Sequence, residues 1–398
     1  MDDLLVSKYF DYNATTPISD SVAEEMKSCI DLFANPSGIN RHSHSNKILL
    51  NYHRNTLARL LGTNSSRIFF TSGGSEANNW AIKGTLSQLV KTPCHIITTA
   101  IEHPSVLETI KYSAKLFGFD VSIILPHTNG VVAYEDIVKA IRTDTQLISM
   151  MFANNETGML QPVRPVAKIA FERNIRFHVD GVQVIGKRRV NIEEIGVDFL
   201  SLSAHKFYGP KGIGALYVRD PKLIEPLIHG GGQEMTLRSG TENLVAISGL
   251  SQAAADADAN VDLWDNHCWS CKKYLLDLLN RSRIKFSING LTGYEHCMSN
   301  TLSLAILGIR AEALAVLMEK KYDFIFSLGS ACSNNKSKKL SHVLEAMQLS
   351  EKEIQSSIRI SFGRFTTFEC IRTFVQSLES CVDQLAAISY SSIQLEEL

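Results

Sequence analysis

The sequence predicts an α/β fold, in which a large domain with a mostly parallel sheet flanked by helices is joined to a smaller α+β domain. Three observations support this. The 398 residues are too many for one compact core. Short β-rich runs alternate with helical stretches from about residue 20 to 220. Several of those runs are apolar nearly throughout, which is typical of strands covered on both faces.

Seven strands are predicted for the large domain, with amphipathic helices such as 76–90 and 163–174 between them. The strands are expected at 67–71, 95–100, 121–125, 146–153, 175–180, 198–203 and 214–219. Ligands in such sheets bind beyond the carboxyl ends of the strands. Polar residues that follow these runs are therefore the first candidates for a functional site.

The character of the chain changes after an Ala-rich helix at 241–260. The remainder mixes helices with short strands at 301–307 and 357–362. We therefore expect a large domain over residues 15–258. Residues 1–14 and 259–398 are expected to form the small domain.

Composition excludes several classes of protein. The formal net charge is −1, with 44% hydrophobic and 20% charged residues, which gives no footprint for nucleic acid or a membrane surface. No apolar run is long enough to span a bilayer. The opening MDDLLVSKYF lacks the basic and apolar regions of a signal peptide, so a cytoplasmic protein with reduced cysteines is expected. Cys268 and Cys271 are interpreted as neighbours on one helix face rather than a metal or redox pair, and no metal site is expected.

The first chemical motif is TSGGSEANN, at 71–79, which follows a strand and opens a helix. Its small residues would let the backbone approach an anion, and the helix N-terminus supplies N–H groups and a positive dipole end. The motif therefore suits a phosphate. A Gly-Gly turn before a helix is also common for purely structural reasons, so the motif alone does not decide.

Two further motifs lie at the ends of neighbouring strands. FHVDGVQ, at 177–183, places Asp180 at a strand end, either as a helix N-cap or as an acid partner for a ring nitrogen. SAHKFYGPKG, at 203–212, places Lys206 after a buried strand, where a desolvated amine is suited to a Schiff base. A phosphate cradle, a ring-nitrogen carboxylate and a Schiff-base lysine are together what pyridoxal phosphate requires of a protein.

At this point the chain resembles the cysteine desulfurases, which are fold-type-I pyridoxal-phosphate enzymes of the class V aminotransferase group. The resemblance runs from YFDYNATTP (9–17) to RISFG (359–363), nearly the whole chain. The motifs that carry it, in order, are DYNATTP, TSGGSEANN, IEHPSV, NNETG, HVDGVQ, SAHKFYGPKG, GGGQEMTLRSGTEN, GSACS and SHVLEAM.

The resemblance implies pyridoxal 5'-phosphate as the cofactor, with Lys206 as the Schiff-base residue and proton shuttle. His103, in IEHPSV, would stack on the cofactor ring and assist proton transfer. Asp180 would pair with the pyridine nitrogen, and Gln183 would hydrogen-bond the phenolic oxygen. The residues that would hold the phosphate are Gly74, Ser75, Ser203 and His205.

The resemblance also assigns substrate and subunit contacts. Asn155, in NNETG, would contact both cofactor and substrate, and it would bind the substrate carboxylate together with Arg359. The planar fork of an arginine accepts a carboxylate in a bidentate pair. Thr241, in RSGTEN, would reach the phosphate bound by a neighbouring subunit, which implies a homodimer.

Cys332 lies in SLGSACSNN, a small and polar stretch read as an exposed mobile loop over about 326–340. The lysines that follow could favour its thiolate, or they are simply a solvated loop tip. By resemblance, Cys332 takes the sulfur of L-cysteine as a persulfide, alanine is released, and the sulfur passes to an acceptor protein. Iron–sulfur assembly, tRNA thiolation and DNA phosphorothioation are the pathways implied.

The chain departs from the family pattern at Asn40 and Ser43, where a histidine and a glycine are common. A selenocysteine lyase, or another class V pyridoxal-phosphate enzyme such as a transaminase, is the nearest alternative. A catalytically idle scaffold is the alternative from a different class. Such a scaffold would be expected to lack one or more catalytic groups. The groups of this chain are all present: Lys206, Asp180, His103 and Cys332.

Overall fold

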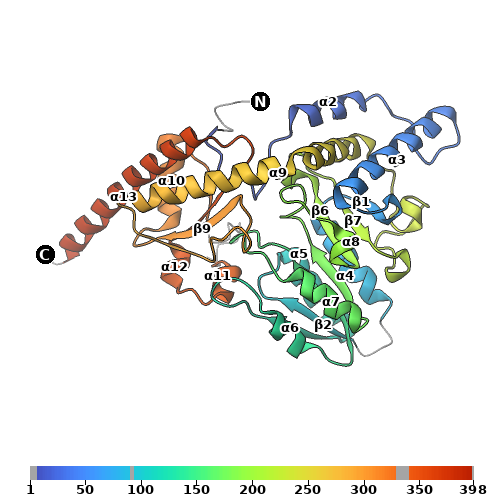
Figure 1. Ribbon diagram of the computed structural model, residues 1–398, viewed down its shortest axis with the longest axis horizontal. Coiled ribbons are helices and arrows are strands. Elements are labelled where there is room, and N and C mark those ends of the chain that lie inside the picture. Colours follow the sequence, from blue (N-terminus) through green and yellow to red (C-terminus); the bar gives the residue numbers. More distant parts are fainter. Residues whose placement is uncertain (1–6, 90–93, 329–339, 397–398) are drawn as a thin grey trace.

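The computed structural model describes residues 7–89, 94–328 and 340–396, and it contains a seven-stranded and a four-stranded sheet (Figure 1). The large sheet has the order β1-β7-β6-β5-β4-β2-β3. Strand β7 is antiparallel to both of its neighbours, and the other pairs are parallel. The predicted mostly parallel sheet is confirmed.

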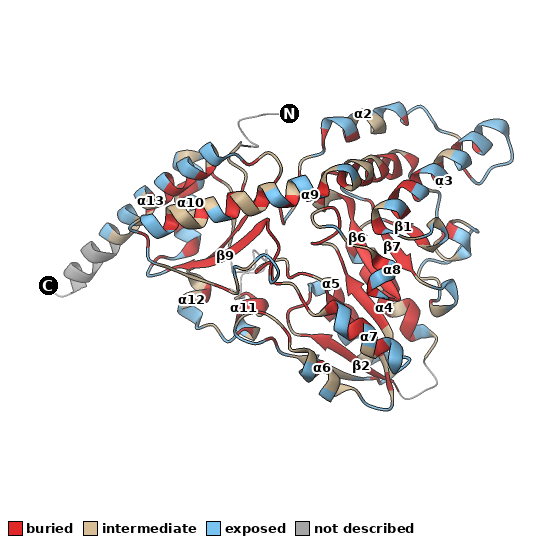
Figure 2. Ribbon diagram, viewed as in Figure 1, coloured by how far each residue is buried: buried red, intermediate tan, exposed pale blue. Residues whose placement is uncertain are grey.

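Each strand of the large sheet coincides with a predicted run to within two residues. The strands are β1 (Ile68–Thr71), β2 (His95–Thr99), β3 (Asp120–Ile124), β4 (Thr145–Met151), β5 (Arg176–Asp180), β6 (Phe199–Ser203) and β7 (Gly214–Val218). All but β3 are buried almost throughout, as the nearly continuous apolar runs predicted (Figure 2).

Helices cover both faces of this sheet. On one face lie α4 (Gly74–Ser87) and α5 (Pro104–Phe117), and on the other lie α3 (Arg41–Leu61), α7 (Val163–Glu172) and the first half of α9 (Leu244–Arg281). The period of two within a strand divides the side chains between the faces. Ile68 and Phe70 join the α3 side, whereas Phe69 packs against Trp80 of α4. The remaining helices of this part are α2 (Asp20–Ser28), α6 (Tyr134–Ala140) and α8 (Ile192–Ile195).

The four-stranded sheet is antiparallel, with the order β10-β11-β9-β8. Its strands are β8 (Phe286–Ile288), β9 (Thr301–Ile306), β10 (Ser327–Leu328) and β11 (Ser357–Ser361), and its helices are α10 (Ala311–Tyr322), α11 (His342–Ala346), α12 (Glu351–Gln355) and α13 (Phe368–Glu396). Helices α9, α10 and α13 pack together beside this sheet (Figure 1). The predicted strands at 301–307 and 357–362 are β9 and β11.

Helix α9 joins the two parts, because it runs without a break from Leu244 to Arg281. The sequence predicts an Ala-rich helix at 241–260 and a separate helix at 268–282, which carries Cys268 and Cys271, but the two are one element. Leu250 belongs to the core of the large sheet, whereas Leu275 belongs to the core of the small one. The predicted domain boundary near residue 258 lies inside this helix and stays a prediction.

Cys268 and Cys271 are buried on α9, in the core of the small sheet. Burial raises the pKa of the Cys271 thiol to about 12 and that of Cys268 further still. Both thiols therefore stay protonated at neutral pH and pack as small apolar side chains. No helix in the described part of the chain combines the length and apolarity needed to cross a membrane.

Candidate active site

A cavity of about 390 Å³ lies beyond the carboxyl ends of β4, β5 and β6, where the sheet topology predicts a ligand site. It gathers every predicted site residue except Thr241 and Cys332. Those that line it are Gly74, Ser75, His103, Asn155, Asp180, Gln183, Ser203, His205, Lys206 and Arg359. Thr241 is exposed in the segment before α9, and Cys332 lies outside the described residues.

One end of the cavity is built for an anion. Helix α4 begins at Gly74, and its N-cap is Gly73, which has no side chain to cap the first turn and has φ of 154°. The amide groups of the first turn and the positive end of the helix dipole are therefore open to a ligand. A Cβ atom on Gly73 would lie 3.7 Å from Oγ of Ser203, so this turn faces the end of β6.

His205 adjoins this end of the cavity and is uncharged at neutral pH. Burial, followed by repulsion from Lys206, lowers the pKa of His205 to about 4. Its Nδ1 atom lies 3.1 Å from the hydroxyl of Thr15. A neutral imidazole held in this way offers a hydrogen bond to an anion rather than a charge.

Asp180 ends strand β5 and is held through both carboxylate oxygens. Oδ2 accepts a hydrogen bond of 2.8 Å from Nδ2 of Asn78, and Oδ1 accepts one of 3.0 Å from the backbone N–H of Val182. The Asn78 amide also donates to Ser105. The carboxylate is buried and oriented toward the cavity, as a partner for a protonated group requires.

Lys206 follows β6 and points back toward the N-terminal segment. Its Nζ donates to the carbonyl oxygens of Asn13 at 2.7 Å and Ala14 at 2.8 Å. Burial, followed by repulsion from Arg359, lowers the pKa of Lys206 to about 8. Roughly a tenth of the amine is then neutral at pH 7, far more than for an ordinary lysine, which suits a nucleophile that attacks a carbonyl.

His103 is the N-cap of α5, and its ring orientation is set by the helix. Nδ1 accepts a hydrogen bond of 3.1 Å from the backbone N–H of Ser105, so the neutral ring carries its proton on Nε2. Desolvation at the cavity lowers the pKa of His103, opposed by the nearby charge of Asp180. The imidazole is therefore neutral near pH 7 and offers one N–H to the cavity.

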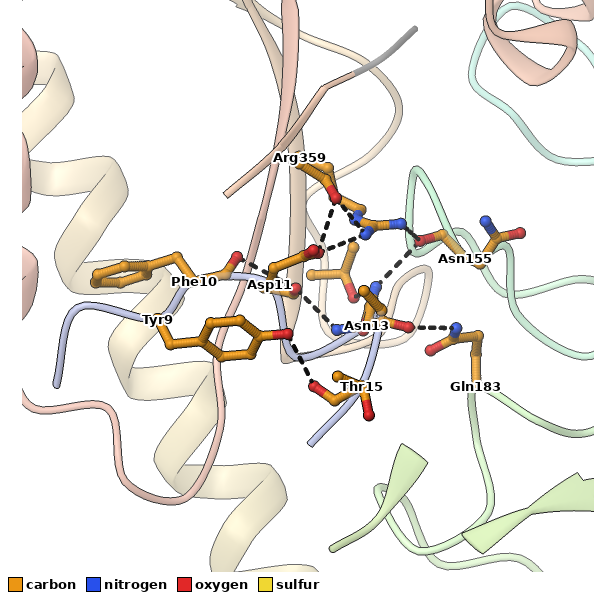
Figure 3. A network of polar contacts seen from close by, with 12 residues as sticks. Tyr9, Phe10, Asp11, Asn13, Thr15, Asn155, Gln183 and Arg359 are labelled. Carbon is orange, nitrogen blue, oxygen red and sulfur yellow. Dashed lines mark hydrogen bonds and ion pairs between the residues drawn. The ribbon is translucent and has the colours of Figure 1, made fainter. Parts of the chain in front are cut away.

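Arg359, on β11, brings the small sheet to the cavity (Figure 3). Its Nη2 donates to Oδ1 of Asp11 at 2.6 Å and to Oγ of Ser327 at 2.7 Å. Nη1 donates to the backbone oxygen of Asn155 at 2.9 Å. The guanidinium is thus fixed where the two parts of the chain meet, and the N-terminal segment anchors it there.

The N-terminal segment supplies site residues to which the sequence reading gives no role. Asp11 pairs with Arg359, and Asn13 lies between Asn155 and Gln183 (Figure 3). Its Nδ2 also bonds Thr301, and its Oδ1 accepts from Lys187 and Asn300; the carbonyl of Asn13 accepts from Lys206. Both residues belong to the DYNATTP motif, which was the signal available. Asn78, in TSGGSEANN, is likewise a cavity residue to which the sequence motif assigns no role.

Asn40 and Ser43, the two departures from the family pattern, lie at the start of α3. Asn40 is the N-cap of this helix, and its Oδ1 accepts a hydrogen bond of 2.9 Å from the N–H of Ser43. Neither residue lines the cavity. Their described contact is a helix cap, which stabilises the first turn of α3.

Comparison with known proteins gives consistent matches. The family model for class-V aminotransferases matches residues 8–374. The protein named cysteine desulfurase IscS from Dictyoglomus turgidum is 38% identical over 382 residues, which are 96% of each chain. A solved structure of a NifS-like protein has a TM-score of 0.88 and 37% identity, covering 95% of this chain and 99% of the other. A structure described as SspA in complex with cysteine has a TM-score of 0.79 and 36% identity, covering 90% and 100%.

Proposed function

Because this chain belongs to the cysteine desulfurases of the class-V aminotransferase family, we propose that it converts L-cysteine to L-alanine with pyridoxal 5'-phosphate. The sulfur is left as a persulfide on Cys332. The observation that carries the proposal is the convergence in one cavity of Lys206, Asp180 and the open N-terminus of α4, with Arg359 also in the lining.

The residues present fit the cofactor. The uncapped first turn of α4, with Ser75, Ser203 and His205, would hold the phosphate. Asp180 would face the pyridine nitrogen, and Gln183 the phenolic oxygen. Lys206, with its lowered pKa, would bond the aldehyde carbon. When bound, the cofactor supplies an electron sink for the charge left on the substrate when its Cα proton departs.

The side chains of this chain position the substrate and move its proton. Asp180, held by Asn78 and Val182, would accept a hydrogen bond from the pyridine nitrogen and favour its protonated form. The amine of Lys206, when free, would be the base that takes the Cα proton of the substrate. Arg359 and Asn155 bind and orient the substrate carboxylate, whose charge complements the guanidinium.

The sulfur step uses Cys332. Its thiolate bonds to the substrate sulfur as the Cβ–S bond breaks, and the electron pair of that bond stays with the carbon fragment, which becomes alanine after protonation. Cys332 is left as a persulfide, and a thiol of an acceptor protein takes the outer sulfur. The proposed pathways are iron–sulfur assembly, tRNA thiolation and DNA phosphorothioation. Measuring persulfide transfer to candidate acceptor proteins distinguishes among them. A cytoplasmic location belongs to the same proposal.

A homodimer is also proposed. Thr241 is exposed and does not line the cavity of its own chain, which supports its assignment to a neighbouring subunit's phosphate. The stretch between α2 and α3 presents apolar side chains to solvent, with Phe33 94% and Ile39 fully exposed. Such side chains are expected at a surface that a second copy covers.

The test is to load the purified protein with pyridoxal phosphate and measure alanine formed from L-cysteine, with L-selenocysteine as the competing substrate. We expect a visible absorbance band and repeated turnover of L-cysteine. Lys206→Ala should lose both. A visible band with alanine formed from selenocysteine but not from cysteine would replace the proposal by a selenocysteine lyase. A visible band with no alanine from either substrate would contradict both activities.

A further inference from the structure

Lys187 lies behind the cavity wall, in the turns that follow β5, and the proposed reaction gives it no role. Its Nζ donates to Oε1 of Gln183 at 2.7 Å and to Oδ1 of Asn13 at 3.2 Å. Gln183 and Asn13 are buried, with 7% and 2% of their surfaces exposed. Lys187 therefore joins two buried amides that border the cavity.

The orientation of both amides follows from backbone carbonyls, which only accept hydrogen bonds. Nδ2 of Asn13 donates to the backbone oxygen of Asn155 at 3.2 Å, so its Oδ1 must face the other way, toward Lys187. Nε2 of Gln183 donates to the backbone oxygen of Asn13 at 3.2 Å, which turns its Oε1 toward Lys187 as well. Lys187 thus faces two amide oxygens.

A lysine can donate a hydrogen bond to both amide oxygens in either protonation state. Burial, followed by repulsion from Lys206 and Arg359, lowers the pKa of Lys187 well below its usual value. Even a neutral amine has two N–H groups, one for each oxygen. Without Lys187, Oδ1 of Asn13 would keep only the donor from Asn300, and Oε1 of Gln183 would lose its donor in a buried place. The carbonyl of Asn13 alone, at 3.2 Å, would then oppose a turn of the Gln183 amide that brings its oxygen toward the cavity.

We propose that Lys187 is a positioning residue that fixes the Gln183 amide with its NH₂ group as an obligatory donor toward the ring oxygen of the bound cofactor. The inference rests on the proposed function, because it concerns the same cavity. A donor stabilises a negatively charged oxygen, whereas a flipped amide would present a carbonyl oxygen and repel it. Lys187 therefore sets the proton affinity of the bound cofactor through Gln183.

The test uses the full chain loaded with pyridoxal phosphate and measures the pH midpoint of its visible absorbance band. We expect Lys187→Met to raise this midpoint by about one pH unit, because the donor to the ring oxygen is no longer held. Lys187→Arg, which keeps only donors, should return it close to the wild-type value. Lys272→Met is the matched control: Lys272 is buried on α9 and contacts Cys297 and Met298 instead, so its loss should leave the midpoint unchanged.

A second pair of variants separates positioning from a direct effect of charge. In a Gln183→Leu background, Lys187→Met should produce no further shift. An equal shift in that background, or an unchanged midpoint in Lys187→Met alone, would overturn the inference. If Lys187→Met does not fold, Lys187→Gln takes its place. A glutamine amide donates to one of the two oxygens more readily than to both, so a smaller rise of the midpoint is expected. An unchanged midpoint in Lys187→Gln would overturn the inference. A wild-type protein without a visible band would instead contradict the proposed function, and this inference with it.

Discussion

At the scale of single residues, the amine of Lys206 lies in surroundings that favour its neutral form. Two carbonyl oxygens accept its hydrogens, but burial and the charge of Arg359 outweigh the attraction of Asp11 and Asp180, and the pKa falls to about 8. Below that pH the amine is mostly protonated and cannot attack an aldehyde. Above it the nucleophilic form dominates.

The rate at which the cofactor-free protein takes up pyridoxal phosphate should therefore rise with pH and level off above a midpoint of about 8. Stopped-flow absorbance at the visible band measures this rate. A midpoint near the ordinary lysine pKa of 10.5 would show that the cavity does not desolvate Lys206 as described.

Arg359 is predicted to act on substrate binding more than on chemistry. Arg359→Lys replaces a planar fork by a single ammonium group, which cannot hold Asp11, Asn155 and a carboxylate together. We expect the KM for L-cysteine to rise about tenfold or more, with kcat changing less. Arg372→Lys, at an exposed ion pair on α13, is the control and should leave KM unchanged. An equal fall in kcat with no change in KM would argue against a substrate-binding role.

At the scale of elements, the segment between β7 and α9 is tied to the large sheet by buried charge. Arg54 of α3 donates to both carboxylate oxygens of Glu234 at 2.6 Å, and Glu234 also accepts from the N–H of Phe70 on β1. Arg238, in the same segment, pairs with Glu76 in the first turn of α4. These pairs fasten the segment that carries Thr241 to α3, β1 and the first turn of α4.

Glu234→Ala should lower the free energy of unfolding by about 3 kcal/mol, because it leaves the Arg54 charge and the Phe70 N–H buried without their partner. Urea denaturation measures this. The double variant Arg54→Met with Glu234→Leu should recover most of the loss. Asp383→Ala removes an exposed ion pair with Arg283 and should cost well under about 1 kcal/mol. Similar losses for the two alanine variants would contradict the weight given to the buried pair.

At the scale of the whole molecule, two sheets contribute to one cavity through the N-terminal segment. Asp11 forms a backbone β-bridge with Ser361 of the small sheet. Asn13 forms hydrogen bonds with Thr301 of the small sheet and with Asn155 and Gln183 beside the large sheet. The proposed second subunit would complete the phosphate end through Thr241. The site is therefore expected to depend on assembly as well as on folding.

Sedimentation should show a dimer, and the double variant Phe33→Asp with Ile39→Asp should weaken it. These are the most exposed large hydrophobic side chains in the described part of the chain, and charges there oppose burial against a second copy. The dimer-weakened variant should also bind pyridoxal phosphate less tightly. A fully active monomer would contradict the assignment of Thr241.

What the sequence predicts well is what depends on local pattern. The buried strands and their polar ends follow from apolar runs and motif spacing, so Asp180 and Lys206 were found at the correct edge of the sheet. What it misses depends on contacts between distant segments. Nothing in the spacing shows that Asp11 meets Arg359, or that Lys187 bonds Asn13. The sequence pattern divides helix α9 in two because the residues that it buries belong to one core in its first half and to the other core in its second half.

The central claim is tested most directly by mass spectrometry of the Cys332 peptide after the loaded protein has met L-cysteine without an acceptor. The account predicts one added sulfur on Cys332, together with about one alanine per subunit in the first turnover. Cys332→Ala should keep the visible band and carry no persulfide. Alanine formation at the normal rate in that variant, or a persulfide on another cysteine in the wild type, would contradict the account.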